Sequence, residues 1–138
     1  YSIPIGRAHL AKVGRHVTLI GWGAQHQQNM LAAETLEREH GIDVEVINLR
    51  TLAPLDVSAL LASVQKTGKA IILQEDSLFG GIASDISALI MEQCFEYLDA
   101  PVKRVASIET PIPFASQLEQ QYLAKRTFEQ ELITLLEY

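Results

Sequence analysis

Two acids and two glycines stand close together in the stretch QEDSLFGGIASDI, residues 74–86. Glu75 and Asp76 end an apolar run, and Gly80 and Gly81 precede a helix-like segment. Open α/β sheets bind ligands at strand-to-helix junctions of this kind, where backbone N–H groups can hold an anion. The two acids would repel an anion, and on a strand they point to opposite faces, so they form no carboxylate dyad unaided. A structural turn is therefore the favoured interpretation.

The stretch GWGAQH, residues 21–26, is a second junction whose residue types suggest chemistry. It resembles a dinucleotide-binding fingerprint, in which glycines let the backbone approach a pyrophosphate at a helix N-terminus. His26 stands at the position of the third glycine, which the fingerprint needs for close packing of helix on strand. We therefore expect a tight turn, with nucleotide or small-ligand binding by residues 21–26 or 79–82 as the alternative.

The histidines and the single cysteine lack the spacing that metal or nucleophilic chemistry needs. His9, His16, His26 and His40 form no i, i+4 pair and have no adjacent carboxylate in a ligand motif. Cys94 lies on an apolar stripe and is expected to be a small buried side chain. The sequence contains no nucleophile elbow, Walker loop or H-E-x-x-H motif. It therefore predicts no catalytic, cofactor-binding or metal-binding residue in this chain.

Several segments rich in branched residues are predicted strands that position the two turns. VTLIGWG (17–23), VEVINLR (44–50) and KAIILQED (69–76) are nearly continuous apolar runs, as expected of strands covered on both faces. VKRVAS (102–107) is a further strand, and RAHLAKVG (7–14) is a candidate edge strand.

Helical periodicity separates these strands. Apolar residues between 57 and 64 recur at helical spacing, with Asp56 placed to cap this helix and Gly68 to end it. A second apolar stripe follows residues 82–98. The last helix carries a third stripe, which consists of Phe128, Leu132, Leu135 and Leu136. Strands that alternate with helices predict an α/β fold with a parallel sheet between two helical layers.

Length and composition agree with one such domain over residues 1–138. Apolar residues make up 48% of the chain, and no apolar run approaches the ~20 residues of a membrane helix. The net charge of −6 argues against a general nucleic-acid surface. We expect a three-layer αβα domain with a mostly parallel sheet of about five strands and helices on both faces. Because the chain begins with Tyr1, we expect it to be a piece of a larger protein.

A resemblance covers residues 3–138. The segments IPIGRAHLAKVGRHVTLIGWGAQ, VEVINLRTLAPLD, QEDSLFGGIASDI, CFEYLDAPVKRV and TPIPFA occur in this order. Together they resemble the C-terminal domain of the β subunit of thiamine-dependent 2-oxo acid dehydrogenases of the pyruvate and branched-chain type. Transketolase has a C-terminal domain of the same fold.

This resemblance implies an oxidoreductase that decarboxylates a 2-oxo acid and passes the acyl group to lipoyl-lysine. Thiamine diphosphate and magnesium would bind elsewhere in the parent enzyme, and the isolated chain would be inactive. Implied partners are an α subunit or fused α part, a second β chain and the lipoyl acyltransferase core, with no nucleic acid and no membrane. The bacterial cytoplasm is the expected compartment, with the mitochondrial matrix as the alternative. A transketolase-type enzyme for sugar phosphates is an alternative function. Gln74 and Ile82 depart from the branched-chain pattern, so the resemblance does not decide the substrate.

Asp99 and Tyr138 are the residues expected to bind a partner. The apolar stripe that ends at Leu98 predicts that the helix stops at Asp99, where a carboxylate opposes the helix dipole. An uncharged turn residue would serve there equally well, so the charge indicates a use. In the resembling family, the matching acid and the terminal carboxylate receive basic side chains from the acyltransferase's subunit-binding domain. The alternative is an ordinary solvated turn aspartate.

Overall fold

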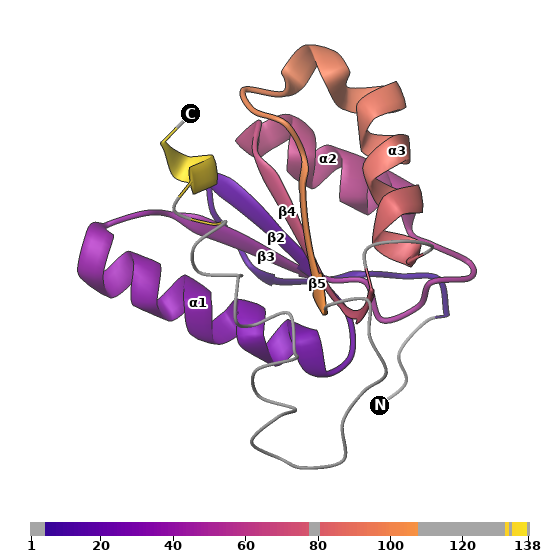
Figure 1. Ribbon diagram of the computed structural model, residues 1–138, viewed down its shortest axis with the longest axis horizontal. Helices are drawn as coiled ribbons and strands as arrows, with labels where there is room; N and C mark the ends of the chain where they lie inside the picture. Colours follow the sequence, from indigo (N-terminus) through magenta and orange to yellow (C-terminus); the bar gives the residue numbers. More distant parts are fainter. Residues whose placement is uncertain (1–4, 78–80, 108–131, 133, 138) are drawn as a thin grey trace.

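The computed structural model describes residues 5–77, 81–107, 132 and 134–137 (Figure 1). The described elements, in chain order, are β1 (His9–Lys12), β2 (Val17–Gly21), α1 (Ala24–His40), β3 (Val44–Asn48), α2 (Val57–Thr67), β4 (Ala70–Ser77), α3 (Ile82–Cys94), the 3-10 helix η1 (Phe95–Tyr97) and β5 (Lys103–Ser107). The five predicted strands are all present, and the expected α/β architecture is confirmed.

The strands form one sheet in the order β1-β3-β2-β4-β5. Strands β2 to β5 are parallel, and β1 pairs antiparallel with β3 at one edge. The chain moves from β2 to one side, into β3, and then returns past β2 to β4 and β5 on the other side. The topological switch point therefore lies between the carboxyl ends of β2 and β4, which is where open α/β sheets most often bind ligands.

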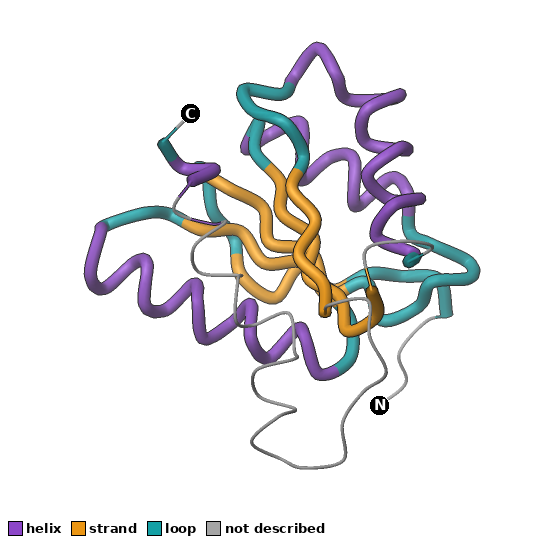
Figure 2. Tube along the Cα trace, viewed as in Figure 1, coloured by secondary structure: helices purple, strands orange, loops and turns teal. Residues whose placement is uncertain are grey.

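The helices cover both faces of the sheet (Figure 1). Helix α1 and the helical turn at residues 134–136 lie over one face, and α2 and α3 lie over the other, with the strands between them (Figure 2). Each side has its own apolar cluster. On the α1 side it includes Val17, Leu19, Leu36, Val46, Leu132 and Leu135, and on the α2–α3 side it includes Ile20, Ile47, Leu60, Val64, Ile86 and Ile90. The three-layer prediction is confirmed.

Helix α2 begins and ends at the predicted residues. Asp56 Oδ1 accepts the N–H of Ala59 at 3.3 Å, and Gly68 ends the helix in the left-handed conformation with φ of 75°. Asp56 also holds the chain before β1, because its Oδ2 accepts the N–H of Ala8 at 2.9 Å. This single carboxylate therefore connects the start of α2 to the N-terminal segment.

The prediction for residues 82–98 needs a correction at its end. Helix α3 stops at Cys94, and the tighter η1 turn follows, so the side chains leave the direction of the α-helical stripe. Phe95 was expected on the buried stripe, yet 68% of it is exposed. Cys94 is buried as predicted, and its Sγ lies 3.8 Å from the carbonyl oxygen of Leu61.

In the last predicted helix, Leu132 and Leu135 are buried, and Phe128 lies outside the described residues. Within the described part of the chain, no helix has the length and apolar character needed to cross a membrane.

Candidate functional site

The turn at residues 21–26 joins β2 to α1 at the switch point. Gly21 ends β2, and Gly23 precedes α1 with φ of 60° and ψ of −139°, a conformation that side-chain-bearing residues rarely adopt. The helix begins with no side-chain cap and with no acid in its first turn. The predicted tight strand-to-helix turn is confirmed, and it leaves the positive end of a 17-residue helix without an anionic partner from that turn.

Polar side chains on the buried side of α1 lack partners near this turn. Gln25 is 5% exposed and Asn29 is fully buried. Gln25 Oε1, both amide atoms of Asn29 and Nδ1 of His26 have no hydrogen-bond partner among the described residues. Buried polar atoms are almost always hydrogen-bonded in native proteins, so such a group of atoms needs an explanation. This group of buried polar atoms was not predicted from the sequence. Polar residues on the side of α1 that faces the sheet weaken its amphipathic pattern, so the buried side could not be recognised.

The environment of His26 is partly buried and positively charged. Burial lowers the pKa of His26, and the neighbouring His9 and Arg50 lower it further. Arg50 has φ of 59°, and its N–H bonds to Asn48 Oδ1 at 3.1 Å. His26 is therefore neutral near pH 7, and its Nδ1 or Nε2 can act as donor or acceptor according to the tautomer.

The stretch 74–86 contains a structural contact at the start of α3. Gln74 is buried, and its Oε1 accepts the N–H of Ala83 at 2.6 Å, so a side chain from β4 satisfies the first turn of α3. Gly81 precedes α3 in an extended conformation with φ of −80°, which residues other than glycine also adopt. Gly80 lies outside the described residues, and Glu75 and Asp76 belong to β4. The helix-capping role of Gln74 was not predicted from the sequence.

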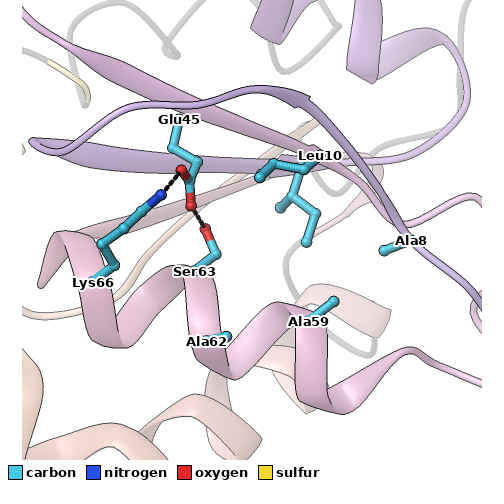
Figure 3. Close-up of a pocket in the computed structure, with 8 residues that line it drawn as sticks. Ala8, Leu10, Glu45, Ala59, Ala62, Ser63 and Lys66 are labelled. Carbon is cyan, nitrogen blue, oxygen red and sulfur yellow. Dashed lines mark hydrogen bonds and ion pairs between the residues drawn. The ribbon is translucent and has the colours of Figure 1, made fainter.

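A cavity of about 330 Å³ lies between the edge strand β1 and α2 (Figure 3). Its lining combines apolar residues with a serine and two charged side chains, and consists of Ala8, Leu10, Glu45, Ile47, Ala59, Ala62, Ser63 and Lys66. Glu45 is 1% exposed, although it is a carboxylate on the parallel part of the sheet. An isolated charge in this position would be costly, so its partners decide what the cavity can do.

Glu45 is surrounded by hydrogen-bond donors. Ser63 Oγ donates to its Oε2 at 2.5 Å, and the Lys66 ammonium forms an ion pair with it (Figure 3). The N–H of Gly14 also donates to its Oε1, at 3.1 Å. Ser63 and Lys66 are three residues apart on α2, a spacing that some serine nucleophiles share with their lysine base. Here Glu45 accepts from both side chains, so the group neutralises a buried carboxylate rather than activating a hydroxyl.

Asp99 lies at a helix end, although not at the expected one. Its N–H donates to the carbonyl oxygen of Gly68 at 2.8 Å. Its carboxylate lies against the same glycine, because a Cβ added to Gly68 would meet Asp99 Oδ2 at 2.5 Å. Asp99 therefore faces the C-terminal end of α2 instead of ending the helix at 82–98. The Asp99 carboxylate therefore opposes the dipole of α2, rather than that of the helix for which the opposition was expected.

The surroundings of Asp99 include exposed apolar residues and the end of the described chain. Phe95 and Tyr97 of η1 are 68% and 51% exposed, and Met91 at the end of α3 is 40% exposed. Lys69, which follows Gly68, points its Nζ to within 3.5 Å of the carbonyl oxygen of Leu136. Asp99 and the last described residues thus both adjoin the link between α2 and β4. Tyr138, the other predicted partner-binding residue, lies outside the described residues.

These observations define a class of protein: an α/β domain with a mostly parallel five-stranded sheet between two helical layers. Among the residues that the structure describes, no three His, Cys, Asp or Glu side chains gather closely enough to hold a metal ion.

Residues 6–127 match the family model of the transketolase C-terminal domain, so the chain belongs to that family. The fold is similar to that of a split-gene transketolase, solved as an inactive β4 tetramer. The TM-score is 0.82 and the identity 27%, over 99% of this chain and 43% of that chain. The resemblance inferred from the sequence segments is confirmed.

Curated relatives are more similar in sequence than this transketolase. The 2-oxoisovalerate dehydrogenase subunit beta, mitochondrial, of Dictyostelium discoideum is 45% identical over 82% of this chain and 30% of its own length. The mitochondrial pyruvate dehydrogenase E1 component subunit beta of the same organism is 44% identical over 86% and 33%, respectively. The acetoin:2,6-dichlorophenolindophenol oxidoreductase subunit beta of Bacillus subtilis is 43% identical over 89% and 36%. The chain spans about a third of the length of these relatives.

Proposed function

We propose that the chain is an assembly and partner-binding domain of the decarboxylating component of a 2-oxo acid dehydrogenase complex. The parent enzyme would oxidatively decarboxylate a 2-oxo acid, pyruvate or a branched-chain one, and transfer the acyl group to lipoyl-lysine. The observation that carries the proposal is the 43–45% identity to dehydrogenase and oxidoreductase β subunits over most of the chain. The lower identity of 27% to a transketolase makes a sugar-phosphate enzyme the weaker reading.

The described part of this chain offers no cluster of ligands for the magnesium ion implied for the parent enzyme. Magnesium takes several oxygen ligands, mainly carboxylates, phosphates and water. The described residues offer no group of three metal-ligating side chains, so they supply no such site. We therefore assign thiamine diphosphate and magnesium to other parts of the complete enzyme, and expect the isolated chain to be inactive.

Association with other chains supports the assembly role. The related split-gene transketolase is described as a β4 tetramer, and we propose that this chain also contacts a second copy and an α chain. Several relatives are mitochondrial β subunits and others are bacterial. We propose the bacterial cytoplasm as the compartment, with the mitochondrial matrix as the alternative.

The surface around Asp99 is our proposed docking site for the lipoyl acyltransferase. Interface cores are enriched in aromatic residues, and Phe95 and Tyr97 of η1, which precedes Asp99 in the chain, expose such side chains. A carboxylate beside an apolar surface suits a basic partner that also buries apolar area. The chain's net charge of −6 would steer such a partner toward it. Tyr138 is proposed as a second contact, because the residues before it adjoin Lys69.

The test measures the affinity of the chain for the subunit-binding domain of the acyltransferase, at low and high salt. Asp99→Asn is expected to weaken binding by ~1–3 kcal/mol if the ion pair is desolvated, and the wild-type affinity should fall steeply with salt. Glu34→Gln, an exposed acid on α1, is the matched control and should bind like the wild type. Equal affinities for wild type and Asp99→Asn would reduce Asp99 to a turn residue.

Stability provides a second readout for the same variants. Removing a carboxylate from the C-terminal end of α2 should leave folding unchanged or stabilise it by ~0.3–1 kcal/mol. A lost affinity together with an unchanged melting temperature would therefore report the docking contact itself.

A further inference from the structure

The start of α1 has the geometry of an anion site that the proposed docking role does not use. It lies at the switch point, whereas Asp99 lies beside the C-terminal end of α2. Gly23 supplies a backbone conformation that turns the chain into the helix, and a Cβ built on it would meet no atom within 4 Å. The space above this turn is therefore open to a small group. The first backbone N–H groups of a helix have no acceptor within the helix, although that of His26 here donates to the carbonyl oxygen of Gly23 at 3.2 Å.

Buried side chains without partners lie under this turn. Asn29 is fully buried, and a Cβ added to Gly21 would meet its Nδ2 at 2.6 Å, so the amide points at the end of β2. Gln25 lies one turn earlier on the same side of α1 and is 5% exposed. Neither the amide atoms of Asn29 nor Gln25 Oε1 bond to any described residue. They provide donors and acceptors beside the helix end.

The register of the sheet places basic side chains near the same turn. His9 of β1 pairs with Asn48 of β3, and Asn48 pairs with Gly21 of β2, so His9 and the turn lie on one row across three strands. Arg50 follows Asn48 by two residues, and its exposed side chain has no ion pair with the described residues. Arg50, which is positively charged at neutral pH, and His9 both lie close enough to His26 to lower its pKa.

We propose that the start of α1, with Gln25, Asn29 and Arg50, binds a small oxyanion. A carboxylate or a phosphate group has the required chemistry: it accepts from the first N–H groups of α1 and from the Arg50 guanidinium. Asn29 Nδ2, which bonds to no described residue, is a further donor where the ligand reaches below the turn. A hydroxyl on the ligand would donate to Gln25 Oε1.

The expected affinity is low. A helix N-terminus with a few polar side chains is a weak anion site, so we expect a dissociation constant on the order of 1 mM.

The experiment follows the backbone amide resonances of Ala24, Gln25 and His26 in the 138-residue chain. Inorganic phosphate and acetate are titrated separately at constant ionic strength. Saturable shifts confined to these amides support the site. The anion that binds more tightly shows whether the site prefers a phosphate or a carboxylate. Absence of saturable shifts with both ligands overturns the proposal.

Two variants and a control sharpen the result. Arg50→Gln changes an exposed residue and should raise the dissociation constant about tenfold. Asn29→Asp places a negative charge under the turn and should weaken binding at least as much. Arg38→Gln removes an arginine from the last turn of the same helix and should bind like the wild type. If all of these variants bind like the wild type, the shifts arise from non-specific ion effects and the proposal is wrong.

Discussion

Two groups of buried polar side chains lie near opposite ends of the central strands, and they differ in how they are satisfied. Near the amino ends, Glu45 accepts from Gly14, Ser63 and Lys66, and Thr18 bonds to Ser63. At the carboxyl end of β2, Asn29 and Gln25 contain atoms without a partner among the described residues. Fully bonded buried groups hold elements in place, whereas unbonded ones destabilise the fold by their lost hydration until something binds them. The comparison therefore separates a structural site from a candidate binding site.

The strongest test of the structural group is Glu45→Ala. This change leaves the N–H of Gly14 and the hydroxyl of Ser63 without their acceptor in the interior. We expect a loss of ~3–5 kcal/mol in the free energy of unfolding, measured by urea denaturation. Glu39→Ala, an exposed acid on α1, is the control and should change stability by less than ~0.5 kcal/mol. A loss below about 1 kcal/mol would mean that the bonded group does not hold α2 against the sheet.

A pair of variants tests the contrast between the two groups directly. Thr18→Val removes the hydroxyl that bonds to Ser63 at 2.9 Å and to Thr67 at 2.8 Å, and should cost ~1–2 kcal/mol. Asn29→Leu removes an amide that bonds to no described residue, so it should cost less than Thr18→Val. Urea denaturation of both variants measures the difference. A larger loss for Asn29→Leu would show that its amide already has a stabilising partner in the folded chain.

The pH dependence of Asp56 gives the smallest expected effect. The N–H of Ala8 lowers the pKa of Asp56 below its usual 3.8, the N–H of Ala59 and the hydroxyl of Ser58 lower it further, and burial opposes them. Because the folded state favours the carboxylate, this stabilisation is present above about pH 4 and is lost as the pH falls through the lower folded pKa. Asp56→Ala should cost ~1 kcal/mol at pH 7.

Measurements of thermal stability at neutral pH and near pH 3 check this prediction. The gap between wild type and Asp56→Ala should narrow at the lower pH, since the wild-type carboxyl becomes protonated. Ser58→Ala is the control, because the hydroxyl of Ser58 lies 3.4 Å from Asp56 and adds only a weak bond. A gap that stays constant with pH would indicate that the charge of Asp56 is not what stabilises the fold.

Local signals predicted much of this fold. The strands, the Asp56 cap and the Gly68 terminus were all evident from neighbouring residues, because capping and burial patterns act within a few positions. The end of α3 was not, since the change to a 3-10 turn at Phe95 leaves no trace in the apolar spacing.

The sites were harder to predict than the fold. Asp99 was expected at the end of its own helix, but its contacts are with Gly68, which is 31 positions earlier in the chain. Glu45 was counted within an apolar strand, because Ser63 and Lys66 are distant in sequence and become its partners only when α2 packs on the sheet. The unpartnered atoms of Asn29 likewise emerge only from the packing of α1.

The central position of β2 has a consequence for the order in which the domain opens. Its five residues are buried, and it is paired on both sides, with β3 and with β4. By contrast, β1 and β5 each have a single strand neighbour in the described sheet. Each amide hydrogen of β2 therefore exchanges with solvent only when the interior of the sheet opens between β2 and the strand that it bonds to, whereas those of β1 exchange after local fraying of one edge. Hydrogen exchange should accordingly proceed from the two edges of the sheet inward, with β2 as the last segment to lose protection.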